Sequence, residues 1–151
     1  LNLVKLLKLH KLYVHIQTNG TNFNKELFDL CDFISCDVKT PAFDAVSDDE
    51  TIKNISMFYP DKHEFKFIVR NESDLKFVKV EIERLSLQQS QIVLQPYEQS
   101  PSKDGLEYAS NIQESYRLLI ELVTKDNFFG YKKVKILPQL HKLAYGNKKG
   151  V

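Results

Sequence analysis

Short apolar runs alternate with amphipathic stretches along almost the whole chain. Five runs have the length and composition of β-strands, at 12–16, 33–38, 64–69, 92–95 and 134–137. Between them, apolar residues spaced three or four apart predict helices over about 22–31, 47–57, 72–85 and 105–124. The first residues fit the end of a further helix. Strands separated by such helices predict an α/β fold with parallel strands and right-handed crossovers.

Local signals sharpen these boundaries. Ser47-Asp48-Asp49-Glu50 matches a capping box, with Ser47 as the expected N-cap. Asn71 is expected to cap the next helix, and Pro96 is expected to end the fourth strand. The architecture is then either an open doubly wound sheet or part of a (β/α) barrel. No repeat or linker divides the chain, so 1–151 is predicted to belong to one domain.

Composition and charge exclude several classes of partner. The chain has 151 residues, and 21 basic against 20 acidic residues give a net charge of +1. This balance provides no overall attraction to nucleic acid or to a membrane surface. No apolar run approaches the roughly 20 residues that cross a bilayer, and no signal peptide is evident. We therefore expect a soluble, cytoplasmic protein without a membrane partner.

Polar clusters follow three of the predicted strands, at 17–21, 35–39 and 95–98. Parallel α/β folds bind ligands at the carboxyl ends of their strands, so these clusters predict one shared site. Taken singly, Gln17-Thr18-Asn19-Gly20 also fits a simple turn, and Asp37 with Lys39 also fits a surface ion pair.

Other chemical motifs are sparse. Cys31 and Cys36 have neither Cys-x-x-Cys nor zinc-knuckle spacing, which predicts buried thiols, and the four histidines are scattered without metal-ligand spacing. Neither a Gly-x-Gly-x-x-Gly motif nor a phosphate loop is present. Residues 127–151 contain six lysines and no carboxylate, which fits either a solvated tail or an RNA contact.

Five segments, taken in order and spacing, resemble the 7-carboxy-7-deazaguanine synthase family of radical S-adenosylmethionine enzymes. These segments are 17–21, 37–41, 64–69, 95–96 and 134–151. The Leu-Pro-Gln-Leu-His-Lys-Leu sequence at 137–143 is the most specific of them. The resemblance implies a parallel (β/α) partial TIM-type barrel of the radical SAM type, with a tail over 138–151 that covers the substrate.

The implied reaction converts 6-carboxy-5,6,7,8-tetrahydropterin to 7-carboxy-7-deazaguanine with loss of ammonia. It belongs to 7-deazapurine synthesis, which leads to queuosine and archaeosine. The family uses S-adenosylmethionine, a [4Fe-4S] cluster and Mg²⁺, and a 5′-deoxyadenosyl radical starts the reaction. The implied partners are a pterin substrate and a second copy of the chain, without nucleic acid.

The resemblance assigns site residues by position. Substrate contacts fall on Thr18, His141 and the terminal carboxylate of Val151. Cofactor contacts fall on Gly20, Ser35, Asp37, Lys39, Gln95, Pro96 and Glu98. Many relatives carry Ser-Pro-Lys where this chain has Asp37-Val38-Lys39, so the sequence departs from the family there.

A second departure concerns the iron–sulfur cluster. The family binds it through Cys-x-x-x-Cys-x-x-Cys, whose three thiolates leave one iron open, and this chain lacks that motif. We therefore expect the C-terminal part of a barrel with its N-terminal strands missing, inactive alone and prone to self-association through the apolar strand at 12–16.

Two alternatives stay open. A glycyl-radical-activating relative would share the Asn-Gly and Asp-x-Lys strand ends, although the 137–143 sequence argues against it. A non-catalytic α/β fragment could instead bind RNA or protein through its lysine-rich tail.

Overall fold

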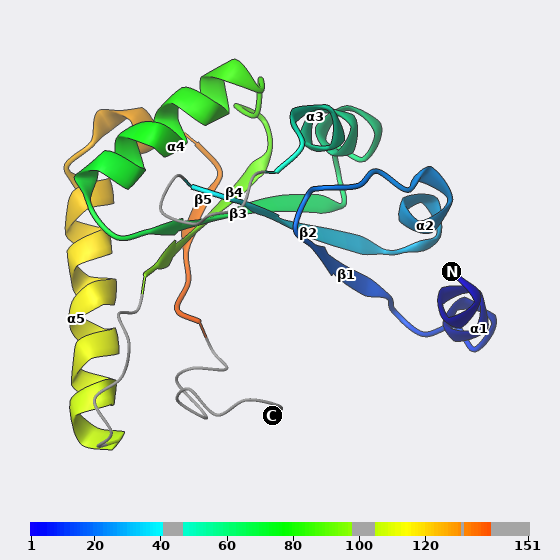
Figure 1. Cartoon of the computed structure of the whole chain (residues 1–151), viewed down its shortest axis with the longest axis horizontal. Helices are drawn as coiled ribbons and strands as arrows, with labels where there is room; N and C mark the ends of the chain where they lie inside the picture. Colours follow the sequence, from blue (N-terminus) through cyan, green and yellow to red (C-terminus); the bar gives the residue numbers. More distant parts are fainter. Residues whose placement is uncertain (41–46, 98–104, 131, 140–151) are drawn as a thin grey trace.

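Five parallel strands form one sheet at the centre of the protein (Figure 1). The structure, a computed structural model, describes residues 1–40, 47–97, 105–130 and 132–139. The strands are β1 (His15–Thr18), β2 (Phe33–Val38), β3 (His63–Val69), β4 (Gln91–Pro96) and β5 (Val134–Ile136). Their order in the sheet is β1-β2-β3-β4-β5, so each pairs with its neighbours in sequence. The predicted α/β class and parallel pairing are confirmed. The order does not reverse, as it would in a doubly wound sheet.

Helices connect consecutive strands. They are α2 (Lys25–Leu30), α3 (Asp49–Phe58), α4 (Glu72–Arg84) and α5 (Gly105–Thr124), while α1 (Asn2–Leu9) precedes β1 and a short 3₁₀ helix, η1 (Asn127–Phe129), follows α5. Figure 1 shows α2, α3 and α4 on one side of the sheet, with α5 along its edge. Crossovers of a single hand along an unreversed strand order place the connecting helices together in this way.

Side chains along each strand point alternately to one face of the sheet and to the other. On β3, His63, Phe65, Phe67 and Val69 are buried, whereas the residues between them are half-buried. The buried set continues on both neighbouring strands through residues of 0 or 1% exposure, namely Ile34, Cys36, Ile92 and Leu94. We call this the helix-covered face. The opposite, open face carries His15, Gln17, Ser35, Asp37, Glu64, Lys66 and Gln95.

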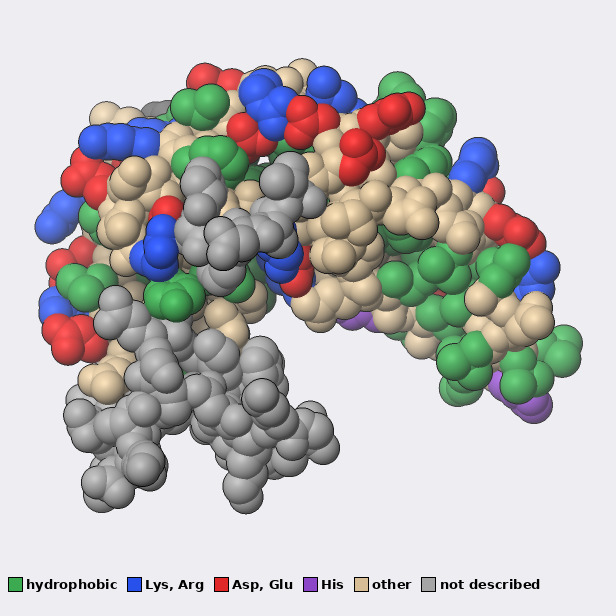
Figure 2. Space-filling model, in the orientation of Figure 1, with side chains coloured by type: hydrophobic (Ala, Val, Ile, Leu, Met, Phe, Trp, Pro, Cys, Tyr) green, Lys and Arg blue, Asp and Glu red, His purple; other side chains and the backbone are tan. Residues whose placement is uncertain are grey.

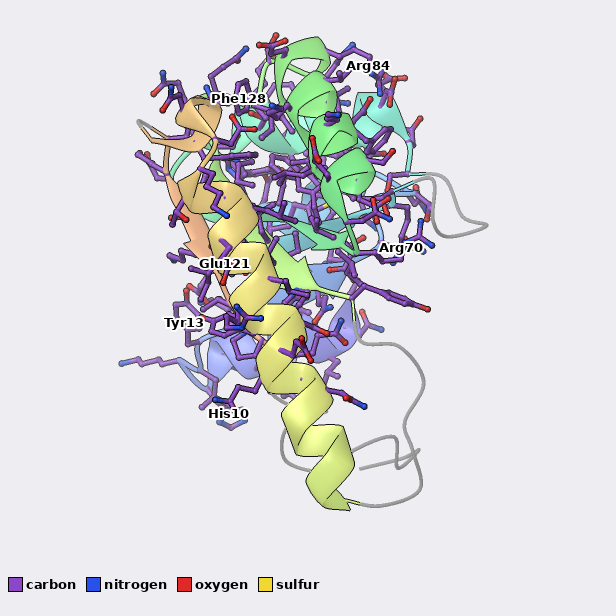
Figure 3. All side chains as sticks on the ribbon, turned by 90° about the vertical axis from the view of Figure 1, so that its left-hand side faces the viewer. His10, Tyr13, Arg70, Arg84, Glu121 and Phe128 are labelled. Carbon is purple, nitrogen blue, oxygen red and sulfur yellow. The ribbon has the colours of Figure 1, made fainter. Side chains whose placement is uncertain are left out.

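Polar contacts join the helices to one another. Arg84, near the end of α4, contacts both Asp49 of α3 and Glu81 one turn before it; Figure 3 shows its place at the end of α4. Lys79 of α4 donates to Asp126 at 2.5 Å, which ties α4 to the start of η1. These pairs connect the helices that cover one face of the sheet.

Several predicted boundaries hold, and three are wrong. The bounds of α5 and β2 are as predicted, Asn71 caps α4 as predicted, and Pro96 is the last residue of β4. The first strand is His15–Thr18 rather than 12–16, because the chain turns after α1 with Lys11 at a φ of 58° and the pairing with β2 continues to Thr18.

The other two errors concern helix starts. Helix α2 begins only after Asn24, whose side chain accepts a hydrogen bond from the amide of Leu27. The N-cap of α3 is Asp48, which accepts from the amide of Thr51 at 2.7 Å, so the capping box on Ser47 is wrong. The Ser47 hydroxyl is instead occupied by backbone groups of two strand-end loops.

Strands β1 and β5 lie at the edges of the described sheet, each with one paired neighbour. Beside β1, α1 and the following turn expose five large apolar side chains among polar ones: Leu3, Leu6, Leu9, Leu12 and Tyr13. Within the described ranges, no helix is long and apolar enough to cross a membrane.

Candidate functional site

The open face gathers polar side chains from four adjacent strands. Gln17 pairs in register with Ser35, Ser35 with Glu64, and Asp37 with Lys66. Residues in register on parallel strands point to the same side, so these side chains form rows across the sheet. The row of Gln17, Ser35 and Glu64 brings together groups that lie up to 47 positions apart in the sequence.

Asp37 is the centre of the row nearest the strand ends. The Gln17 side-chain amide donates to its two carboxylate oxygens at 3.3 and 3.4 Å. Lys66 Nζ lies 3.5 Å from Asp37 Oδ1, and Lys39 Nζ lies 3.9 Å from Oδ2. The carboxylate of Asp37 is therefore compensated by two cations and one amide.

Three side chains form a hydrogen-bonded chain that crosses β1, β2 and β3, with the step from β1 to β2 diagonal to the register. His15 Nε2 lies 2.8 Å from Ser35 Oγ, and Ser35 Oγ donates to Glu64 Oε1 at 2.6 Å. Ser35 has no exposed surface, while His15 is exposed. Because the hydroxyl proton is directed to Glu64, Ser35 accepts from the Nε2–H of His15.

A cavity of about 330 Å³ opens over these rows. Its lining comprises Gln17, Glu64, Lys66 and Gln95, together with residues 137–139 after β5. Figure 2 shows the surface hollowed below the sheet in this view. The volume lies at the lower end of the range of roughly 300 to 1,000 Å³ that small-molecule sites occupy. Three amides, a carboxylate and an ammonium can contact one ligand there.

The ends of β1 and β2 are held together at the rim of this site. Gly20 has a φ of 68°, and a Cβ atom there would lie 2.9 Å from Cys36 Sγ. Ser47 Oγ accepts from the Lys39 amide at 3.1 Å and lies 3.2 and 3.3 Å from the carbonyl oxygens of Asn19 and Asp37. The Gly20 carbonyl accepts from the amide of Asp48 at 2.8 Å. Both conformation and space thus require glycine at position 20.

The structure brings four of the ten site residues predicted from the sequence to the open face, namely Ser35, Asp37, Lys39 and Gln95. Ser35 and Asp37 lie on the open face, Gln95 lines the cavity, and Pro96 ends the same strand. Lys39 follows β2 and reaches Asp37.

Thr18 and Pro96 lie on the helix-covered side of the sheet, since Pro96 is in register with the buried Val69. Thr18 is in register with Cys36, and its hydroxyl accepts from the Gly20 amide at 3.3 Å. Glu98, His141, Val151 and most of the predicted tail at 138–151 lie outside the described residues.

Four cavity or network residues had no assigned role from the sequence: His15, Gln17, Glu64 and Lys66. The signal that identifies them is the strict alternation of β3, which places Glu64 and Lys66 opposite a buried aromatic row. Gln17 belongs to the strand-end cluster 17–21 predicted from the sequence, whereas His15 becomes recognisable only once the register with β2 is known.

The two cysteines do not fit an iron–sulfur cluster. Cys31 Sγ donates to the carbonyl of Phe28 at 3.3 Å, and Cys36 lies beneath Gly20 on the other face from the cavity. Burial raises the pKa of both thiols, that of Cys36 to about 12, whereas cluster ligands are thiolates. Among the residues that the structure describes, no group of three or more His, Cys, Asp or Glu side chains could hold a metal ion.

No known protein-family model matches the chain, and no curated protein matches it.

Proposed function

We propose that this chain forms the binding wall for S-adenosylmethionine and a carboxylated pterin in a radical enzyme that resembles 7-carboxy-7-deazaguanine synthase. The observation that carries the proposal is the cavity lined by Gln17, Glu64, Lys66 and Gln95, next to the strand-end residues Gly20 and Lys39. These are the segments on which the sequence resemblance depends.

The strand order supports a partial (β/α) barrel. A barrel requires strands added in one direction, and β1 to β5 follow that order. The open face would then line the inside of the barrel. Barrel interiors are usually packed with branched apolar side chains, so a polar interior favours a ligand site.

The lining also suits the proposed ligands. A pterin ring has ring nitrogens, an oxo group and N–H donors, and amide side chains such as those of Gln17 and Gln95 both donate and accept. The ammonium of Lys66 would attract the substrate carboxylate. The described residues fit neither a cluster nor Mg²⁺, so the proposal is limited to binding.

Binding of 6-carboxypterin, followed by its ring fluorescence, tests the proposal. The wild-type chain is expected to bind it, and Lys66→Ala is expected to weaken binding about tenfold, the effect of losing one hydrogen bond to a charged group. Lys76→Ala is the matched control, because Lys76 is exposed on α4, away from the cavity lining, and pairs with Glu72. S-adenosylhomocysteine, a stable analogue of the cofactor, is expected to bind by calorimetry.

Failure of both ligands to bind at millimolar concentration would overturn the proposal, as would equal weakening by Lys66→Ala and Lys76→Ala. RNA binding that weakens steeply with salt, without any pterin binding, would favour the non-catalytic alternative.

A further inference from the structure

The two carboxylates of the open face differ in their charge compensation. Asp37 has Lys39 and Lys66 within ion-pair distance and accepts from Gln17. Glu64 forms no ion pair with any described residue and accepts only the neutral hydroxyl of Ser35. A partly buried carboxylate without a cation in ion-pair contact is less favourable in the free protein than one with such a contact. A ligand that brings donors to it would relieve that cost.

The geometry directs one side of Glu64 toward the cavity. Its Oε1 atom accepts from Ser35, whereas Oε2 has no hydrogen-bond donor among the described residues. A carboxylate has about four acceptor positions on its two oxygens, so one neutral hydrogen bond leaves most of them unused.

Two residues hold Glu64 in this orientation. Ser35 is fully buried and directs its single proton to Oε1, and His15 in turn donates to Ser35. The three side chains come from three consecutive strands, so the sheet itself sets their spacing. Neither His15 nor Ser35 lines the cavity.

We propose that Glu64 is the residue that selects ligands with adjacent N–H donors, and that Ser35 and His15 are its positioning residues. The ligand class is an amidine-like edge, such as that of a 2-amino-pyrimidinone, whose amino and ring N–H groups both point to one carboxylate. Lys66 stands two residues away on the same strand and face, where it suits an anionic group on the same ligand. The choice of a pterin as probe rests on the proposed function.

The test compares two probes that differ at one position. In 6-carboxylumazine an oxo group replaces the 2-amino group of 6-carboxypterin. The wild-type chain is expected to bind the pterin about tenfold more tightly, and Glu64→Gln is expected to abolish that preference. Glu72→Gln, on the exposed surface of α4, is the matched control and should keep it.

The positioning residues are tested by the same ratio of affinities. Ser35→Ala and His15→Ala are expected to reduce the preference about threefold each, and Ser35→Thr, which keeps the hydroxyl, to restore it. Damage that is only structural would weaken both probes equally and leave the ratio unchanged. A wild-type ratio near one, or an unchanged ratio in Glu64→Gln, would overturn the inference while leaving the proposed function in place.

A second measurement applies if neither probe binds to the wild-type chain, which would refute the proposed function. Methylguanidine presents adjacent N–H donors without a pterin ring. It is expected to shift the ¹³C carboxyl signal of Glu64 in a saturable way, and that of Glu72 only weakly. Equal responses of the two carboxylates would refute the inference as well.

Discussion

The two faces of the sheet are formed by the same strands, but one face is packed with apolar side chains and the other carries polar side chains around a cavity. On β3, Phe65 and Phe67 have no exposed surface, while Glu64 and Lys66, their immediate neighbours in sequence, line a cavity. The helix-covered face is packed against α2, α3 and α4, and the open face is joined by hydrogen bonds and ion pairs. A single-residue step along a strand therefore separates side chains that hold the fold from side chains available to a ligand.

Phe65→Ala and Lys66→Ala should separate these roles most strongly. Removing the fully buried ring is expected to lower the free energy of unfolding by about 3 to 5 kcal/mol, since it leaves a cavity in the core. Lys66→Ala is expected to cost less than about 1 kcal/mol, because Asp37 keeps Lys39 and Gln17. Urea denaturation measures both. Comparable losses in the two variants would contradict the division between the faces.

Gly20→Ala tests the rim where the two faces meet. The positive φ and the contact with Cys36 Sγ are expected to lower the free energy of unfolding by about 1 to 3 kcal/mol. Gly130→Ala is the control, because Gly130 has a φ of −59° and a Cβ there would lie 3.5 Å from its nearest neighbour. Its effect should stay within about 0.5 kcal/mol. Thermal unfolding of the two variants would show whether this contrast holds.

His63 should make the helix-covered face sensitive to pH. Burial lowers the pKa of His63, although the hydrogen bond from Nδ1 to the Tyr59 carbonyl at 2.7 Å opposes the shift, and Nε2 has no hydrogen-bond partner among the described residues. The unfolded chain therefore takes up a proton first as the pH falls. The contribution to stability is complete above about pH 6.5 and is lost progressively below it.

Urea midpoints at about pH 7.5 and about pH 5.5 measure this loss, and His63→Phe is expected to reduce the difference. The carboxylates of Asp49 and Asp126 do not contribute to the difference between the two midpoints. Arg84 and Lys79 lower their pKa values below the ordinary 3.8, so both stay ionised throughout this window. An unchanged pH dependence in His63→Phe would assign the effect to another group.

Gln17→Ala should have the smallest effect on folding. The side chain is exposed and donates to Asp37 at 3.3 Å, so the free energy of unfolding should change by less than about 0.5 kcal/mol. Because Gln17 lines the cavity, binding of 6-carboxypterin should weaken about threefold. A large loss of stability would show that the open face also holds the fold together.

The helix-covered face was largely predictable because local periodicity determines it. The apolar spacing gave β2 and α5 with their observed bounds, and β3 within one residue. The error at β1 arose because Leu12-Tyr13-Val14 has a strand-like composition, while the structure ends α1 in a turn and ties α1 to the loop between α2 and β2 through Lys8 and Asp32. That contact spans 24 residues and has no local signal.

The site was predictable only in part, for a related reason. Strand-end clusters could be read from the sequence, since ends of parallel strands meet at one edge. Glu64 and His15 could not be assigned, because their meeting at Ser35 depends on the register of three strands. Ser47 was wrongly predicted as a cap because the cap and the loop contact require the same hydroxyl.

The burial of Cys36 directly beneath Gly20 gives the protein a native kinetic probe. A thiol with no exposed surface and a raised pKa reacts with an aromatic disulfide reagent only when the chain around it opens. Cys31, buried at the end of α2, reacts only when that helix end opens. The ratio of the two labelling rates would report how often the rim of the site opens relative to the end of α2. No cysteine has to be introduced for this measurement.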